Sequence, residues 1–233
     1  MRAKTCPVQI LIFGDSILKG VCYENGGYHV EHDWQRAFSE EFGVRIENYS
    51  RFGNTIGKAM KVLRRTCEKQ AEGREIALLE LGGNDCDYDW PEISANPEGV
   101  YHCRTIPEHF AASYREAISL LRSSGREPVA LTLPPILPDR YLNHLCSRGA
   151  SRENLLKWLG SAEELSMWQH TYSCLVRQIA REENVRLIDL RLKYPAEARD
   201  LEPLIGPDGI HPSASGQKLI FDVLCDDARA VLA

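Results

Sequence analysis

The chain has 233 residues, a hydrophobic content of 43%, a charged content of 26% and a formal net charge of −5. These values are ordinary for a globular protein, and a mildly acidic chain without a basic stripe argues against nucleic acid as a partner. No apolar run reaches the roughly 18 residues that a membrane-spanning helix needs. With no linker or internal repeat in the sequence, we expect residues 1–233 to form a single domain.

The apolar segment "VQILIF" near the N-terminus predicts a first strand. A signal peptide would need a longer apolar region and a cleavage site of small residues, so a cytoplasmic protein is expected. The eight cysteines include no CxxC-type pair. In a reducing compartment such cysteines are buried thiols, so neither a disulfide framework nor a structural metal is expected.

The chain contains five short apolar runs that are rich in Val, Ile and Leu. They lie at residues 8–13, 44–50, 75–81, 128–133 and 185–190. Their length and composition are typical of strands buried on both faces, as in a parallel sheet. Segments with helical periodicity alternate with them, at residues 56–70, 107–125, 164–184 and 213–232. Strands that alternate with helices predict a three-layer α/β/α domain with right-handed crossovers.

Two segments are too long for plain connections, at about residues 85–105 and 134–160. They follow the third and fourth predicted strands, at the carboxyl edge where open α/β sheets bind ligands. The substrate is therefore expected beside these two insertions.

Ser16 follows the first predicted strand in the turn "GDS" and precedes a helix. A serine displayed on such a turn could act as a nucleophile if a base accepts its proton. Taken alone, the turn is also explained by Ser16 as a simple helix N-cap.

Asp208 and His211 lie three residues apart in "DGIHPS", before the last predicted helix. The carboxylate can hold the imidazole Nδ1–H and leave Nε2 free as a base. The segment by itself is equally compatible with a local turn and a surface histidine.

The third predicted strand ends in "GGND", where Asn84 could supply an amide donor to an oxyanion. Gly53, in "RFGNT", is a further candidate donor just past another strand. Either segment alone could be an ordinary turn. Together with the serine, the histidine and the aspartate, they contain all the groups that acyl transfer needs.

These segments together resemble the SGNH hydrolase family, the GDSL-type esterases and lipases. "GDSIL" is similar to the first block of the family, with Ile17 where Leu is usual, and "RFGNT", "GGND" and "DGIHPS" are similar to the other three. The resemblance implies a flavodoxin-like fold with five parallel strands. It also implies Ser16 as nucleophile, His211 and Asp208 as its partners, and an oxyanion hole formed by Ser16, Gly53 and Asn84, without a cofactor or metal.

The expected substrate is a small acyl ester, with an acetylated carbohydrate as the more specific hypothesis and a generic short-chain ester as the alternative. Aromatic and charged residues in the insertions are the candidate substrate contacts, namely Tyr88, Trp90, Arg140, Tyr141 and Trp158. These residues could instead pack the insertions onto the domain. Acyl transfer to a sugar or an alcohol, and a non-catalytic protein that binds a small anion, remain alternatives, and the oligomeric state is open.

Overall fold

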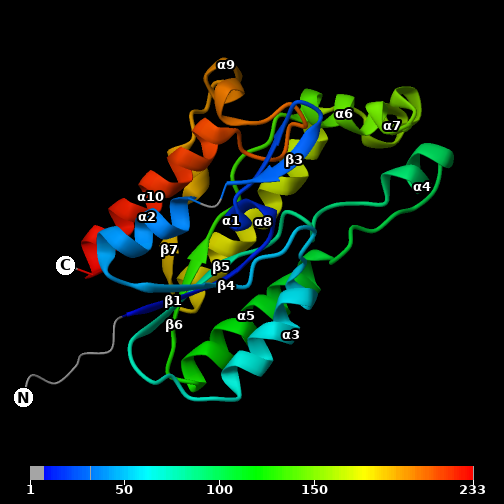
Figure 1. Ribbon diagram of the computed structural model, residues 1–233. Coiled ribbons are helices and arrows are strands. Elements are labelled where there is room, and N and C mark those ends of the chain that lie inside the picture. Colours follow the sequence, from blue (N-terminus) through cyan, green and yellow to red (C-terminus); the bar gives the residue numbers. More distant parts are fainter. Residues whose placement is uncertain (1–7, 32, 233) are drawn as a thin grey trace, which may run out of the picture.

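A parallel five-stranded sheet forms the centre of the structure, a computed structural model that describes residues 8–31 and 33–232 (Figure 1). The strand order is β4-β1-β5-β6-β7. The strands are β1 (Gln9–Gly14), β4 (Arg45–Asn48), β5 (Glu75–Glu80), β6 (Glu127–Leu131) and β7 (Arg186–Ile188). This is the flavodoxin-like order 2-1-3-4-5, so the fold class predicted from the sequence is confirmed.

Helices cover both faces of the sheet, which explains why its strands are apolar on both sides. One face carries α3 (Ile56–Cys67), α5 (Pro107–Ser123) and α8 (Glu163–Glu182). The opposite face carries α2 (Asp33–Phe42) and α10 (Ala214–Leu232). No helix within the described ranges is both long and apolar enough to cross a membrane.

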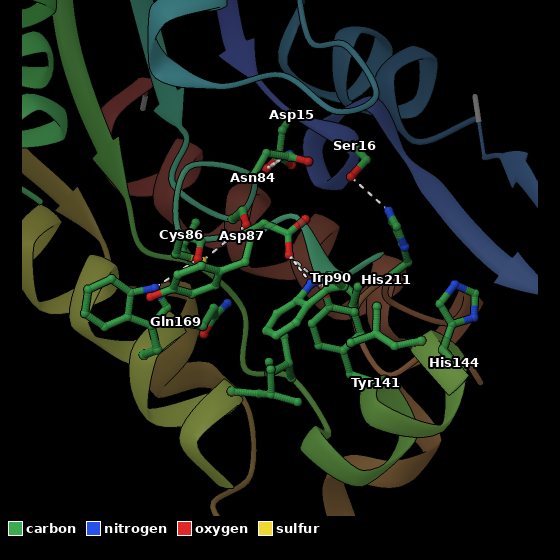
Figure 2. Close-up of a pocket in the computed structure, with 18 of the residues that line it drawn as sticks. Asp15, Ser16, Asn84, Cys86, Asp87, Trp90, Tyr141, His144, Gln169 and His211 are labelled. Carbon is green, nitrogen blue, oxygen red and sulfur yellow. Dashed lines mark hydrogen bonds between the residues drawn. The ribbon is translucent and has the colours of Figure 1, made fainter. Parts of the chain in front are cut away.

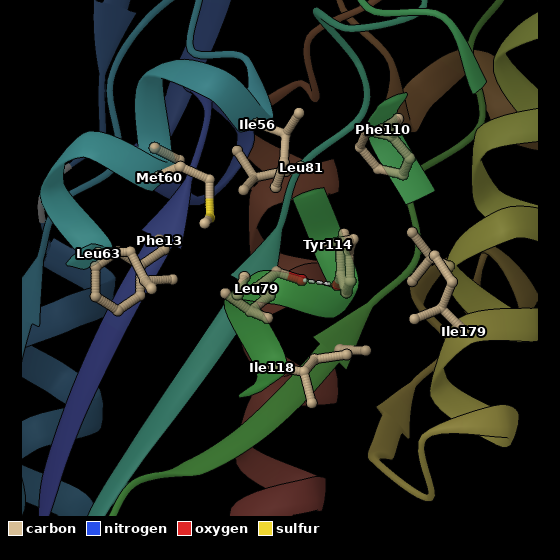
Figure 3. Close-up of a cluster of buried hydrophobic side chains, with 14 of the residues drawn as sticks. Phe13, Ile56, Met60, Leu63, Leu79, Leu81, Phe110, Tyr114, Ile118 and Ile179 are labelled. Atoms are coloured by element: carbon tan, nitrogen blue, oxygen red, sulfur yellow. Dashed lines mark hydrogen bonds between the residues drawn. The ribbon is translucent and has the colours of Figure 1, made fainter. Parts of the chain in front are cut away.

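The packing between α3, α5 and the sheet illustrates how the core is built (Figure 3). Ile56, Met60 and Leu63 recur at helical spacing, so all three point from α3 toward the sheet. Burying an aliphatic side chain of this size stabilises the fold by roughly 1.5–3 kcal/mol. Tyr114 of α5 is fully buried, and its hydroxyl donates a hydrogen bond to the Leu79 carbonyl oxygen over 2.9 Å.

The two insertions form a separate layer above the carboxyl end of the sheet. They contain α4 (Trp90–Ala95), α6 (Pro138–Ser147) and α7 (Arg152–Leu159). The Ser94 hydroxyl accepts from the Ser151 backbone N–H over 2.7 Å, and the Ser94 carbonyl accepts from Asn154 Nδ2 over 2.7 Å. A hydrophobic cluster that includes Trp90 of the first insertion and Leu142 of the second connects them. The insertions are therefore packed against each other as one unit.

A β-hairpin that the sequence analysis did not predict follows the first short helix, α1 (Ser16–Lys19). Its strands are β2 (Val21–Glu24) and β3 (Gly27–Val30). The turn residues Asn25 and Gly26 both have positive φ, 51° and 77°. An Asn-Gly pair is the strongest short-range signal of a β-hairpin, so this hairpin could have been predicted from the sequence.

The remaining elements are short and lie between β7 and α10. They are η1 (Leu190–Lys193), α9 (Ala198–Leu201) and η2 (Glu202–Leu204). The seven cysteines within the described residues have free thiols, and Cys6 lies outside those residues.

Candidate active site

The turn between β1 and α1 presents Ser16 at the carboxyl edge of the sheet. Asp15, and not Ser16, caps the helix, because its carboxylate accepts the Ile17 N–H over 2.9 Å. The interpretation of Ser16 as a helix N-cap is therefore wrong, and the Ser16 hydroxyl is free to bind another partner.

Ser16 lies beside His211, although the two residues are 195 positions apart in the sequence (Figure 2). Ser16 Oγ and His211 Nε2 are 2.9 Å apart, and His211 Nδ1 lies 2.6 Å from Asp208 Oδ2. The second oxygen of Asp208 accepts the backbone N–H groups of Ile210 and His211, each over 3.1 Å. The serine, imidazole and carboxylate thus form one continuous hydrogen-bonded chain, the arrangement that activates a serine toward acyl groups.

Asp208 is completely buried, yet it is held in its ionised form. Burial alone would raise its pKa, but the hydrogen bond and positive charge of His211 and the two backbone N–H donors outweigh burial and lower the pKa. An anion at this position fixes the imidazole with its proton on Nδ1, so that Nε2 faces Ser16 as an acceptor.

The loop that carries Asp208 and His211 is fitted closely against α6. Gly209 has a φ of 78°, and a Cβ atom there would lie 2.3 Å from the backbone nitrogen of Tyr141. The Gly209 carbonyl accepts the Leu137 N–H over 2.9 Å. Glycine is needed here for both the backbone conformation and the space, and the contact ties the His211 loop to the second insertion.

Asn84 follows β5 and faces Ser16 across the edge of the sheet. Its Nδ2 donates a hydrogen bond to Asp15 Oδ2 over 3.0 Å. An amide nitrogen carries two protons, so this bond orients the second proton of Asn84. Asn84, Ser16 and Gly53 all line the same cavity, as the arrangement of an oxyanion hole requires.

The loop that carries Gly53 is held from two sides. Both carboxylate oxygens of Asp85 lie 3.0 Å from the Ile56 N–H at the start of α3. Asn54 Nδ2 donates to the Gly14 carbonyl over 2.9 Å, which ties the loop to the end of β1. Asp85 is fully buried, and burial raises its pKa to about 6.

Two aromatic side chains that the sequence analysis did not single out cover the imidazole. The Phe52 ring is stacked on His211 with a centroid distance of 5.6 Å and an interplanar angle of 9°. Tyr28, from the unexpected hairpin, meets His211 edge-on at 5.2 Å. Both rings are partly exposed, Phe52 by 53% and Tyr28 by 42%, so they form the outer rim of the site.

A cavity of about 500 Å³ extends from Ser16 and Asn84 beneath the insertions. This volume is within the range of small-molecule sites in proteins. Four of the five predicted substrate contacts line it, namely Tyr88, Trp90, Tyr141 and Trp158, together with Trp168 of α8. The Tyr88 ring lies 5.0 Å from that of Trp158 and 5.5 Å from that of Trp90, so the aromatics form a continuous wall.

The polar atoms of three of these five aromatic side chains, Trp90, Tyr141 and Trp168, are held in hydrogen bonds. Asp87 Oδ1 accepts from Trp90 Nε1 and from the Tyr141 hydroxyl, each over 2.7 Å. The other oxygen of Asp87 forms an ion pair with Arg104 at 3.0 Å. Trp168 Nε1 donates to the Cys86 carbonyl oxygen over 2.9 Å. A substrate could use the polar atoms of Trp90, Tyr141 and Trp168 only by breaking these bonds.

Arg140, the fifth predicted substrate contact, is not part of the cavity lining. Its Nη1 donates to the carbonyl oxygens of Glu202 and Ile205 over 2.9 and 2.8 Å. The side chain therefore ties α6 to the segment before the His211 loop, and we do not retain Arg140 among the substrate contacts. Arg148, from the same insertion, does line the cavity.

Three buried acidic residues next to the predicted site were missed from the sequence. Asp15 and Asp85 lie inside the recognised motifs and hold Asn84 and the Gly53 loop. Glu80 ends the apolar run of β5 and is fully buried. A charged residue inside such a run is the signal that could have identified it.

Known proteins resemble this chain in sequence. A model of the GDSL-like Lipase/Acylhydrolase family matches residues 12–219. The chain is also 28% identical over 172 residues to the isoamyl acetate-hydrolyzing esterase of Saccharomyces cerevisiae. That match covers 74% of this chain and 63% of the yeast protein, so the chain spans less than two thirds of that relative.

Solved structures share the fold at low sequence identity. The lipase/acylhydrolase from Enterococcus faecalis is similar with a TM-score of 0.61 and 17% identity, over 95% of both chains. A member of the lipolytic protein G-D-S-L family from Veillonella parvula is similar with a TM-score of 0.62 and 15% identity, over 94% of this chain and 97% of that one.

Proposed function

The chain belongs to the GDSL-like lipase/acylhydrolase family, whose members are hydrolases acting on ester bonds, and we propose that it is a serine esterase for short-chain acyl esters. The observation that carries the proposal is the hydrogen-bonded chain from Ser16 through His211 to Asp208. It begins in the same cavity that Asn84 and Gly53 line.

In the first half of the proposed reaction, Ser16 Oγ forms a bond to the ester carbonyl carbon and passes its proton to His211 Nε2. The Ser16 and Gly53 N–H groups and the Asn84 amide stabilise the negative charge on the carbonyl oxygen. The bond to the alcohol then breaks, and His211 returns the proton to the leaving oxygen. The acyl group remains on Ser16 as an ester.

In the second half, a water molecule attacks the acyl-enzyme while His211 accepts one of its protons. Collapse of the second tetrahedral intermediate breaks the bond to Ser16, and the serine oxygen recovers its proton from His211. The products are the free acid and the unchanged enzyme. Each step uses groups of this chain, the ester and water.

The cavity supports esters with apolar groups more than sugar esters. The sequence suggested a carbohydrate because Tyr88 and Trp90 alternate with carboxylates. However, Asp87 is engaged by Trp90, Tyr141 and Arg104, and Asp89 accepts the Glu92 N–H at the start of α4. Asp87 therefore already has three partners, and Asp89 is exposed and does not line the cavity. Isoamyl acetate, after which the yeast relative is named, is accordingly the first ester to test.

The test compares wild type with Ser16→Ala on isoamyl acetate, on p-nitrophenyl esters of increasing acyl length and on an acetylated sugar. Ser123→Ala is a matched control, because that serine is exposed near the end of α5, where its hydroxyl donates to the Leu120 carbonyl. We expect turnover that requires Ser16, is unchanged in the control and decreases with acyl length. Folded Ser16→Ala protein with most of the wild-type rate would refute the nucleophile assignment.

Two further outcomes separate the alternatives. An acyl product on an added alcohol or sugar, formed faster than free acid, would identify an acyltransferase that uses the same acyl-enzyme. If none of the esters shows turnover that depends on Ser16, the remaining hypothesis is a non-catalytic protein that binds a small anion.

A further inference from the structure

Glu80 is a buried acid with no role in the proposed reaction steps. It is the last residue of β5 and is 0% exposed, in register with Gly14 of β1, which directly precedes Asp15. Within the described part of the chain, neither Glu80 carboxyl oxygen has a hydrogen-bond partner. A buried carboxylate without partners is strongly unfavourable, so this side chain needs either a proton or a counter-charge.

The side chain that faces Glu80 is another carboxyl group, that of Asp15. Asp15 is 1% exposed. Two ionised carboxylates are both acceptors and cannot hydrogen bond to each other, which explains why Glu80 lacks a partner when both are ionised. One shared proton removes the repulsion and creates a hydrogen bond between them.

The hydrogen bonds around the pair decide which carboxyl carries that proton. Asp15 accepts the Ile17 N–H over 2.9 Å and Asn84 Nδ2 over 3.0 Å, and both donors stabilise an anion. The donors nearest to Glu80 are the backbone N–H groups of Asp15 and Leu18, which also favour an anion, but neither reaches hydrogen-bonding geometry. Burial raises the pKa of Glu80 well above its ordinary range, and the negative charge of Asp15 raises it further.

We propose that Glu80 is a positioning residue that acts as a neutral acid, donating a hydrogen bond to Asp15 so that ionised Asp15 holds the Asn84 amide in place. This inference rests on the proposed function, since it concerns the group assigned to the oxyanion. The chain of contacts runs from Glu80 to Asp15 to Asn84, so Glu80 acts without touching the ester.

The contacts from Glu80 through Asp15 orient the side-chain amide of Asn84. An oxyanion donor is effective only if it points at the position of the developing charge before the reaction begins. One proton of Asn84 Nδ2 is bound to Asp15, and this bond sets the direction of the other. If Asp15 rotates or takes up a proton, Asn84 loses its anionic acceptor and the second proton loses its direction.

The other titratable groups near the pair are a histidine, two tyrosines and Asp85, a third buried carboxyl group whose pKa the charge of Asp15 helps to raise. Burial raises the pKa of Asp15, whereas the Ile17 N–H and the charge that His211 carries when protonated lower it and favour the anion. Tyr114 and Tyr194 are buried, and both burial and the charge of Glu80 raise the pKa of each phenol. Both phenols therefore stay neutral. Asp85, with a pKa of about 6, is already ionised at alkaline pH, which leaves Glu80 as the carboxyl group of this cluster that ionises there.

The experiment compares Glu80→Gln with Glu80→Leu in the full chain. Glutamine keeps a neutral donor of nearly the same shape, whereas leucine removes the donor and keeps an apolar side chain. We expect Glu80→Gln to retain kcat within a fewfold. Glu80→Leu should lower kcat roughly tenfold to hundredfold with little change in KM, less than the loss expected from removing the donor itself.

Glu75→Gln is the matched control, because Glu75 is a buried acid at the other end of the same strand, paired with Arg126 at 2.8 Å. It should change stability without a selective effect on kcat. The pH profile provides a second readout: the wild type should lose kcat at alkaline pH as Glu80 ionises, and Glu80→Gln should lack that loss.

An infrared spectrum tests the proton directly and does not depend on activity. The wild type at neutral pH should show the carbonyl band of a buried protonated carboxylic acid, and Glu80→Gln should lack it. Absence of this band in the wild type, equal kcat losses in the Gln and Leu variants, or full kcat in folded Glu80→Leu would each overturn the proposal. If Ser16→Ala instead remains active while the band is present, the proposed function fails and the proton assignment stands.

Discussion

The side-chain amide of Asn84 donates a hydrogen bond to the carboxylate of Asp15, with Nδ2 and Oδ2 3.0 Å apart, although the two residues are 69 positions apart in the sequence. Asp15 also caps α1, the helix that begins with Ser16. One carboxylate therefore positions both the proposed nucleophile and a proposed oxyanion donor. The nucleophile turn after β1 and the Gly-Gly-Asn turn after β5 are joined at this point.

Replacement of Asn84 by alanine should lower kcat by about two to three orders of magnitude, with little change in KM, because its amide is proposed to bind the oxyanion more strongly than the ground-state carbonyl. Steady-state kinetics on isoamyl acetate or a p-nitrophenyl ester measure both constants. Asn143→Ala, at an exposed position of α6, is the control. An increase in KM alone would make Asn84 a ground-state binding residue.

Asp208→Asn should lower kcat by roughly four orders of magnitude while the protein stays folded. Asparagine can donate to Nδ1 and so favour the imidazole tautomer that no longer accepts the proton of Ser16. The same assay, combined with circular dichroism to check folding, measures this effect. A loss of less than tenfold would mean that the Asp208–His211 contact of 2.6 Å is structural and does not set the tautomer.

Asp85 should make the stability of the protein depend on pH. Burial raises its pKa from 3.8 to about 6, so its contribution to stability is fully present below pH 3.8 and is lost as the pH rises through about 6. At 1.36 kcal/mol per pKa unit, the loss is roughly 3 kcal/mol.

Urea unfolding across this pH range, in wild type and in Asp85→Asn, measures the difference. The variant should lack this part of the pH dependence, whereas Asp226→Asn, at an exposed carboxylate, should retain it. Parallel stability curves for wild type and Asp85→Asn would contradict the prediction.

Phe52→Ala should lower kcat about two- to fivefold without reducing stability. The ring lies parallel to His211 at 5.6 Å and can stabilise the imidazolium that forms during acyl transfer. Such contacts contribute about 0.5–1 kcal/mol at exposed sites. Phe52→Tyr should restore the rate, and Leu192→Ala, at another exposed apolar residue outside the cavity lining, should leave it unchanged. A stability loss that matches the kinetic loss would point to a packing role.

Local sequence patterns were enough to predict the layers of the fold and the residues of the proposed chemistry. The apolar runs that became β1, β4, β5, β6 and β7 are local patterns, and burial on both faces leaves few other structures for them. The motif residues Ser16, Asn84, Asp208 and His211 could be recognised because each lies in a short segment of distinctive composition.

The directions of the other side chains could not be predicted from the sequence. Arg140 is adjacent in sequence to Tyr141, yet the arginine binds carbonyls outside the cavity and the tyrosine lines it. Glu80 looks like the polar end of an ordinary strand until β1 brings Asp15 against it. The physical reason is that the direction, burial and protonation of a side chain depend on neighbours that are distant in sequence, and those neighbours are established only when the sheet and its insertions pack together.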